Sequence, residues 1–160
     1  MNGRDDLDRM VAALRPWLDE LVLVGGWAHR LHHDHPLASR QPYQPVRTRD
    51  ADLVFNTRAK LSGKISEALA QGGFREDLST DERPPVAQYV LDSGEDGFFA
   101  EFLTPLTGGR TRRDGRGVAT VARSGITAQR LRHLEVLLVA PWPVSVGGDG
   151  SASLPMKTAI

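Results

Sequence analysis

The sequence predicts a single α/β domain built on a mixed β-sheet, with helices packed mainly on one face. Short apolar runs typical of strands alternate along the chain with segments of helical periodicity. The 160 residues are enough for one hydrophobic core. With 40% hydrophobic and 25% charged residues, the composition is that of a globular protein. We therefore expect one folded unit with room for one functional site.

The first three elements are predicted to be a helix, a strand and a second helix. Apolar residues at helical spacing predict a helix over 4–19, in which Pro16 should cause a kink or a last turn. The unbroken apolar run 21–24 predicts a buried strand, which Gly25-Gly26 brings to an end. A helical pattern over 26–33 follows directly.

The middle of the chain is predicted to supply most of the sheet. An irregular, proline-bearing stretch over 35–46 leads to a strand that runs from Asp50 to Phe55. A helix is expected over 58–71, closed by Gly72-Gly73. Three further strands are predicted, of which the last two should form an antiparallel hairpin: 74–77, 86–91 and 98–103.

The C-terminal third is predicted to hold two strands, over 118–121 and 134–139. A short helix over 127–132 is expected between them. Two prolines and a glycine- and serine-rich run then predict a loop over 141–153.

The last residues, 154–160, have the pattern of a helix start, with Pro155 at an early position. We therefore expect the domain to cover 1–146. Residues 147–160 would be a linker and the start of a C-terminal helical region that is missing from this chain, unless the chain is unusually minimal.

Two short motifs carry the chemistry. The side-chain-free turn at Gly25-Gly26 lets backbone N–H groups approach an anion, and a helix N-terminus adds about half a positive charge there. Asp50 and Asp52 project from one face of their strand. Carboxylates placed together repel each other unless a cation lies between them, and their oxygens suit Mg²⁺ completed by phosphate and water. Each motif alone is often only a tight turn or a solvated strand end, but together they predict a site for a triphosphate and its magnesium.

Glu101 is the one acid inside the apolar run 98–103, which makes it a candidate partner for the two aspartates. Burying a lone carboxylate costs several kcal/mol unless it is paired or bound to metal. The alternative is a strand-edge acid that faces water or an arginine.

Together, the glycine turn and the Asp-x-Asp strand resemble the nucleotidyltransferase superfamily typified by DNA polymerase beta. Small prokaryotic members, including toxins of the abortive-infection type, are similar in both segments. The segments that carry the resemblance are Gly25-Gly26-Trp27-Ala28 and Arg47-Thr48-Arg49-Asp50-Ala51-Asp52-Leu53.

This resemblance implies a nucleotidyltransferase fold and a metal-assisted in-line displacement, in which a nucleoside monophosphate moves from a nucleoside triphosphate (NTP) to a hydroxyl group. Two Mg²⁺ ions are implied as cofactors. The implied catalytic and metal-binding residues are Asp50, Asp52 and Glu101. The implied nucleotide-binding residues are Gly25, Gly26, Arg47, Thr48, Arg49 and Lys157.

The acceptor stays open, because transfer to an RNA end such as that of tRNA, to a protein or to a small molecule would use the same acids. A toxin–antitoxin partner is implied by the resemblance alone. The alternative function is a catalytically inactive module of the same fold that binds nucleotide or acts as an antitoxin or scaffold.

Composition narrows the remaining possibilities. The 20 basic residues balance the 20 acidic ones, so no overall charge favours nucleic acid. No apolar run approaches the roughly 18 residues that span a bilayer, and the N-terminus lacks the apolar core of a signal peptide. Without cysteine, disulfides and cysteine-bound zinc are excluded. We expect a cytoplasmic protein with no membrane partner.

Three further features have ordinary explanations that we favour. The arginine-rich stretch 110–116 is typical of a solvated hairpin loop, and contact with triphosphate or RNA is the alternative. Trp27 is expected to be a core anchor rather than a base-stacking platform. Four histidines are expected to cap a helix end or face solvent rather than bind zinc: His29, His32, His33 and His35.

Overall fold

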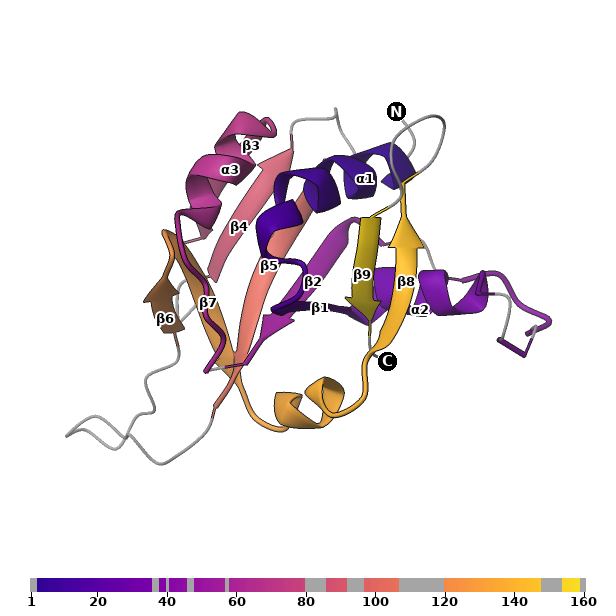
Figure 1. The fold of residues 1–160 in the computed structure, drawn as a ribbon. Helices are drawn as coiled ribbons and strands as arrows, with labels where there is room; N and C mark the ends of the chain where they lie inside the picture. Colours follow the sequence, from indigo (N-terminus) through magenta and orange to yellow (C-terminus); the bar gives the residue numbers. More distant parts are fainter. Residues whose placement is uncertain are drawn as a thin grey trace.

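The computed structural model describes residues 3–35, 38–39, 41–45, 48–56, 58–79, 86–91, 97–106, 120–147 and 154–158. Helices alternate with strands in the first half of the chain, and strands predominate in the second half (Figure 1). The first half contains α1 (Gly3–Ala13), the 3₁₀ helix η1 (Arg15–Trp17), β1 (Leu21–Val24), α2 (Gly25–His33), β2 (Asp50–Phe55) and α3 (Ile65–Gln71). The second half contains β3 (Phe74–Ser79), β4 (Val86–Leu91), β5 (Phe98–Pro105), β6 (Thr120–Arg123), β7 (Ile126–Leu131), the 3₁₀ helix η2 (Leu134–Leu138), β8 (Trp142–Val146) and β9 (Leu154–Thr158).

All nine described strands belong to one mixed sheet, as the sequence predicts. Its main order is β3-β4-β5-β2-β1-β9-β8, and β6 pairs with β7 beside this path. The central strand β5 pairs in parallel with β2, while β4 and β7 share its other edge, β4 along the first half and β7 along the second. Strand β1 lies between β2, which is antiparallel to it, and β9, which is parallel to it.

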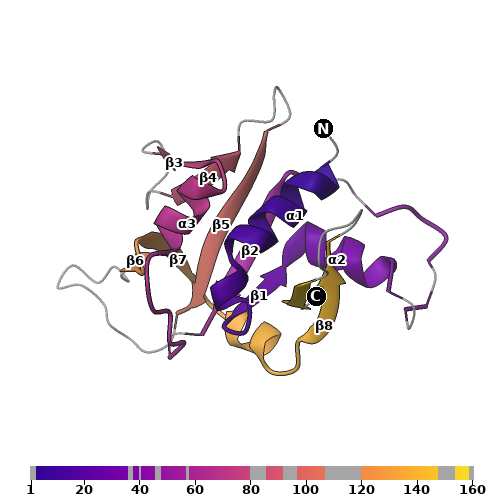
Figure 2. The ribbon, with the colours of Figure 1, turned by 45° about the horizontal axis from the view of Figure 1, so that its top comes forward.

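Helices α1 and α3 lie on the same face of the sheet, where the main core forms (Figures 1 and 2). Apolar residues at helical spacing explain the packing of α1, since Leu7 and Met10, and Leu14 just after the helix, are completely buried. Trp27 of α2 enters the same core, with its ring edge against Phe98 at 6.2 Å between centroids. The expectation that Trp27 anchors the core is therefore confirmed.

The opposite face of the sheet has a second, smaller apolar cluster. It consists of Val22 and Val24 of β1, Val54 of β2 and Leu103 of β5. Leucines 134, 137 and 138 of η2, the short helix at the bottom of Figure 1, pack against it. The rest of this face carries the carboxylates described below.

Several predicted elements are wrong, and tertiary pairing explains most of them. The helix expected over 58–71 is only the seven-residue α3, because Gly63 has a left-handed φ of +80° just before it. The helix expected over 127–132 is strand β7, which bridges β5 and β6 and alternates buried Ile126 and Ala128 with less buried neighbours.

The end of the chain also differs from its prediction. The strand expected over 134–139 is the 3₁₀ helix η2, which starts after the left-handed His133 at φ +67°. The loop expected over 141–153 includes strand β8 at the edge of the sheet, where a proline such as Pro143 is tolerated. The helix start expected over 154–160 is strand β9, held between β1 and β8.

The first helix is shorter than the predicted 4–19 because its regular part ends at Ala13. Pro16 then lies in η1, in the 3₁₀ conformation of a last turn. Among the helices of the described residues, none is long and apolar enough to cross a membrane.

Candidate active site

The glycine turn joins β1 to α2 without any intervening residue. Strand β1 ends at Val24, and α2 begins at Gly25, whose φ is +72°. This left-handed conformation favours glycine. Val24 occupies the N-cap position and has no side-chain oxygen to accept from the first N–H groups of the helix. The first turn of α2 therefore offers N–H groups to an anion.

The strand β2 packs directly over this turn. The β1–β2 register pairs Val24 with Asp52. A Cβ atom on Gly25 would overlap Oδ2 of Asp52, so only glycine fits there with the carboxylate in place. At Gly26 a Cβ atom would lie 2.5 Å from Cγ2 of Thr48. Both glycines are thus covered by the residues that enter and begin β2.

Three carboxylates share the face of the sheet that η2 partly covers. Asp50 and Asp52 alternate with buried Ala51 and Leu53 on β2, and the parallel register pairs Asp52 with Glu101 of β5. Cross-strand partners have side chains on the same face of the sheet, and their two strands lie about 5 Å apart. The structure therefore brings the three predicted acids together on one face of two neighbouring central strands, in the first half of each.

The electrostatics of this face are centred on Asp52. Burial, and then the negative charges of Asp50 and Glu101, raise the pKa of Asp52 from its usual 3.8 to about 6. The side chain of Gln88 on β4 donates a hydrogen bond of 2.7 Å to Oε1 of Glu101. Glu101 is therefore held in place by a neutral donor, while Asp52 experiences the charge of both other acids.

Carboxylate oxygens are the type of ligand that a hard divalent cation prefers. In the part of the chain that the structure describes, no three acidic or histidine side chains are arranged to enclose one metal ion. However, the carboxylates are half-buried, and their mutual repulsion favours a cation beside Asp52. Ligands from phosphate and water would complete such a site, as is usual for Mg²⁺.

The predicted nucleotide-binding residues are placed unevenly. Thr48 lies over Gly26, and its hydroxyl is 3.5 Å from the backbone oxygen of Asp50. The backbone oxygen of Arg49 accepts from the N–H of Phe99, which fixes the chain at the start of β2. Arg47 and the arginine-rich stretch 110–116 lie outside the described residues.

Lys157 lies in β9, where its backbone pairs with Val22. Its side chain lies outside the description, so its contact with a nucleotide stays a prediction.

The four histidines do not gather around one common neighbour. His29 stacks on Tyr43 with 6.3 Å between ring centroids, and Nδ1 of His33 lies 3.1 Å from the Asp34 carboxylate. His32 and His35 both lie beside Trp142.

Sequence reasoning missed Gln88 and Trp142. Gln88 faces Glu101 only because of the antiparallel β4–β5 register. Its position in an alternating strand was the available signal. Trp142 was assigned to a loop, although a large aromatic residue between two prolines is also consistent with an edge strand.

Comparison with known proteins agrees with this geometry. A family model described as a nucleotidyltransferase matches residues 6–159 of the chain. The match includes the glycine turn and both strands that carry the three acids. No curated protein and no solved structure matches the chain significantly.

Proposed function

The chain belongs to a nucleotidyltransferase family, and we propose that it is a Mg²⁺-dependent enzyme that transfers a nucleoside monophosphate from an NTP to a hydroxyl acceptor. Nucleotidyl transfer in general follows from the family. The observation that carries the finer proposal is the contact of the Asp52 carboxylate with Gly25. This contact brings a turn that is suited to phosphate next to acids that are suited to magnesium.

The phosphates of the NTP would lie at the Gly25-Gly26 turn. The first N–H groups of α2 would face these phosphates, because the helix has no side-chain cap. The two glycines have no side chains that would keep the phosphates away from the backbone. Thr48, which covers Gly26, and Arg49, which precedes Asp50, are the proposed flanking contacts. Arg47 and Lys157 remain proposed contacts on the basis of the resemblance.

The metal would be held by Asp50, Asp52 and Glu101, and two ions are part of the proposal. When bound, Mg²⁺ supplies positive charge for the entering and leaving oxygens of the displacement. Asp52 has the central position, because both other acids act on its charge. The hydrogen bond from Gln88 would keep Glu101 turned toward its neighbours. The acids thus hold and orient the reactants, whereas the glycine turn takes no part in proton transfer.

The acceptor is proposed only as a hydroxyl group of an RNA end, a protein or a small molecule. A toxin role with an antitoxin partner would follow from the same chemistry if the acceptor were essential to the cell. These finer assignments rest on the resemblance to small prokaryotic nucleotidyltransferases.

A second function is favoured by one observation. The described acidic and histidine side chains do not enclose a metal ion by themselves. A nucleotide-binding module without catalysis, acting as an antitoxin or scaffold, would need the glycine turn but not a complete set of metal ligands. Binding of triphosphate without any requirement for the acids would be its signature.

Thermal melting with Mg²⁺ and each of ATP, GTP, CTP and UTP tests the proposal. The wild-type chain is compared with Asp50→Asn/Asp52→Asn, which keeps the side-chain shapes and removes both charges. The control is Glu67→Gln/Asp77→Asn, which removes two exposed carboxylates elsewhere. We expect stabilisation by at least one NTP plus Mg²⁺ in the wild type and the control, and none in the Asp50/Asp52 variant.

Two other outcomes have definite meanings. Equal stabilisation of all three proteins, with or without Mg²⁺, would support the non-catalytic module. If no NTP stabilises the wild type, the proposed nucleotide site is wrong. If an NTP does stabilise the wild type, release of pyrophosphate during incubation with candidate acceptors distinguishes nucleotidyl transfer from binding alone.

A further inference from the structure

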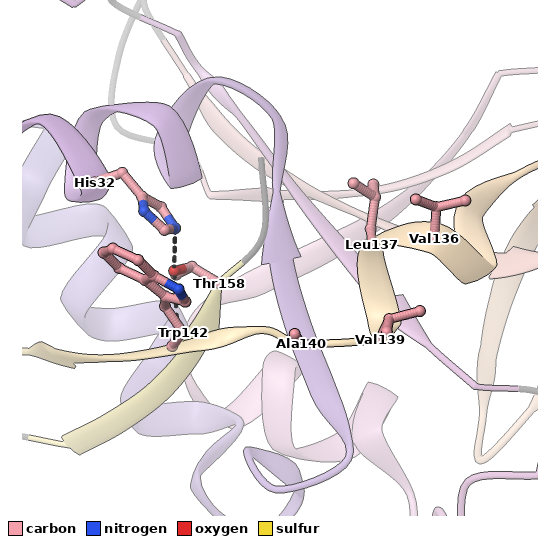
Figure 3. Close-up of a pocket in the computed structure, with 7 residues that line it drawn as sticks. All are labelled: His32, Val136, Leu137, Val139, Ala140, Trp142 and Thr158. Carbon is pink, nitrogen blue, oxygen red and sulfur yellow. Dashed lines mark hydrogen bonds between the residues drawn. The ribbon is translucent and has the colours of Figure 1, made fainter. Parts of the chain in front are cut away.

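A cavity of about 590 Å³ opens between the end of α2, the helix η2 and the β8–β9 hairpin. Figure 3 shows His32 and Trp142 on one side and the apolar side chains of η2 on the other. Trp142 is 43% exposed and Val139 is 81% exposed, unlike the apolar residues of the core. Cavities of this size with apolar walls and a few polar groups are typical of small-molecule sites.

The polar end of the cavity is ordered by hydrogen bonds. Nε2 of His32 lies 2.8 Å from the hydroxyl of Thr158, a side chain that is completely buried. The same hydroxyl lies 3.3 Å from the backbone oxygen of Trp142. His32 is therefore fixed against Trp142, and their rings lie 5.2 Å apart with a tilt of 39°.

The imidazole of His32 is suited to hydrogen bonding as a neutral group. Burial, together with the charge of His35, lowers the pKa of His32. Near neutral pH its ring therefore has one donor and one acceptor nitrogen, of which Nε2 is engaged by the Thr158 hydroxyl.

The cavity lies near the proposed phosphate position. His32 follows Gly25 by seven residues on one helix, which corresponds to about 10 Å along the axis. Thr158 pairs with Leu23 of β1, and Leu23 pairs with Leu53 of β2, so two strand spacings of about 4.8 Å separate Thr158 from β2. The first path places His32 about 10 Å from the glycine turn along the helix axis, and the second separates the backbones of Thr158 and Leu53 by about 10 Å.

We propose that this cavity binds the base of the donor NTP, stacked on the indole of Trp142 with a polar edge toward His32. The proposal rests on the proposed function, which places the triphosphate at Gly25-Gly26. In an NTP, the ribose and the α-phosphate lie between the base and the terminal phosphates. The distance from the base to these phosphates is of the same order as the distance from the cavity to the glycine turn. Every base has a π-face, so stacking does not select strictly between bases. We expect purines to bind better than pyrimidines because their rings are larger.

Trp142 also provides the readout. The chain contains three tryptophans, and the other two, Trp17 and Trp27, are 8% and 1% exposed. Tryptophan emission is measured during titration with ATP and with inorganic tripolyphosphate, both in Mg²⁺. We expect ATP to quench the emission and tripolyphosphate to bind without quenching it.

Calorimetry on two variants isolates the stacking contact. Trp142→Leu keeps an apolar side chain but no π-face, whereas Trp142→Phe keeps an aromatic ring. We expect Trp142→Leu to weaken ATP binding about tenfold. Trp142→Phe should weaken it far less, and neither variant should change the affinity for tripolyphosphate. Thermal melting of each variant shows that the fold is retained.

The outcomes separate this proposal from the proposed function. Unchanged ATP affinity in Trp142→Leu, or an equal loss for ATP and tripolyphosphate, would overturn the base pocket while leaving the phosphate site in place. Quenching by adenosine that ATP does not compete away would assign the cavity to the acceptor and also overturn it. If neither ATP nor tripolyphosphate binds the wild type, the proposed function fails and the pocket fails with it.

Discussion

The carboxylate of Asp52 lies against the backbone of Gly25, so that a Cβ atom on Gly25 would overlap Oδ2. The antiparallel register of β1 and β2 creates this approach by pairing Val24 with Asp52. Gly25 is also left-handed, with φ +72°. The glycine turn and the Asp-x-Asp strand are thus two halves of one site, and each restricts which residues the other tolerates.

Gly25→Ala should destabilise the protein for two reasons. The left-handed conformation costs an alanine about 1–2 kcal/mol. The added Cβ would overlap Oδ2 at the end of the Asp52 side chain, so the carboxylate must turn away, which should add about 0.5–1.5 kcal/mol. Gly63→Ala is the matched control, because φ is +80° there but the nearest side-chain atom, on Trp17, is 3.5 Å from the added Cβ. Urea unfolding should show a clearly larger loss for Gly25→Ala than for Gly63→Ala.

A double-mutant cycle identifies the overlap with Asp52 as the cause. On an Asp52→Ala background, Gly25→Ala should cost no more than Gly63→Ala does, because the carboxylate is gone. An undiminished cost on that background would show that the contact with Asp52 does not restrict Gly25.

Protonation of Asp52 should stabilise the metal-free protein. Burial and the neighbouring acids raise the pKa of Asp52 to about 6 in the folded state, above its usual 3.8. The folded state then binds more protons than the unfolded state between about pH 4 and 6, so the free energy of unfolding falls as pH rises through this window. The loss should be about 1–2 kcal/mol after allowance for solvent screening.

Asp52→Asn removes the titrating group while keeping the shape of the side chain. In buffer with a metal chelator, the stability of Asp52→Asn relative to the wild type should rise between about pH 4 and 6 and stay constant above this range. A difference that does not depend on pH would mean that Asp52 ionises in the folded state as easily as in the unfolded state.

The fold class and the three acids were predictable because they depend on local patterns. Gly25-Gly26 after the buried run 21–24 indicates a turn into a helix, and alternation places Asp50 and Asp52 on one face. Glu101 was selected because the resemblance implies a third carboxylate and Glu101 is the one acid inside the apolar strand β5. These residue types predict the same local structure whichever strands pair with each other.

Other features depend on pairing between distant segments. Residues 127–132 have no strong local preference and become β7 because β5 and β6 lie on either side. Residues 154–158 resemble a helix start, yet they fill the space between β1 and β8. The contact of Gln88 with Glu101 and the cavity at Trp142 likewise follow from register. The sequence alone does not define which residues of two strands pair. A shift of one strand by one residue would turn each of its side chains to the opposite face of the sheet.

The hydrogen bond from Gln88 to Glu101 should stabilise the carboxylate face. Gln88→Met keeps the length of the side chain and removes the donor, leaving a half-buried carboxylate oxygen without it. We expect a loss of about 1–2 kcal/mol in the free energy of unfolding. In the cycle with Glu101→Met, the two single losses should exceed the double loss by about 1 kcal/mol. Additive losses in urea unfolding would show that the two side chains act independently.

Gly26→Ala should separate stability from nucleotide binding. Its backbone is not left-handed, and alanine is a better helix former than glycine by up to about 1 kcal/mol. However, the added Cβ would lie 2.5 Å from Cγ2 of Thr48, so the segment that enters β2 must move. That movement shifts the residues that lead into Asp50 and Asp52, and with them the carboxylates. We expect a stability within about 1 kcal/mol of the wild type, since the two effects oppose each other, together with a severalfold loss of affinity for ATP and Mg²⁺ in calorimetry. Unchanged affinity would place the triphosphate away from Thr48 and Gly26, and would move the proposed phosphate position off the first turn of α2.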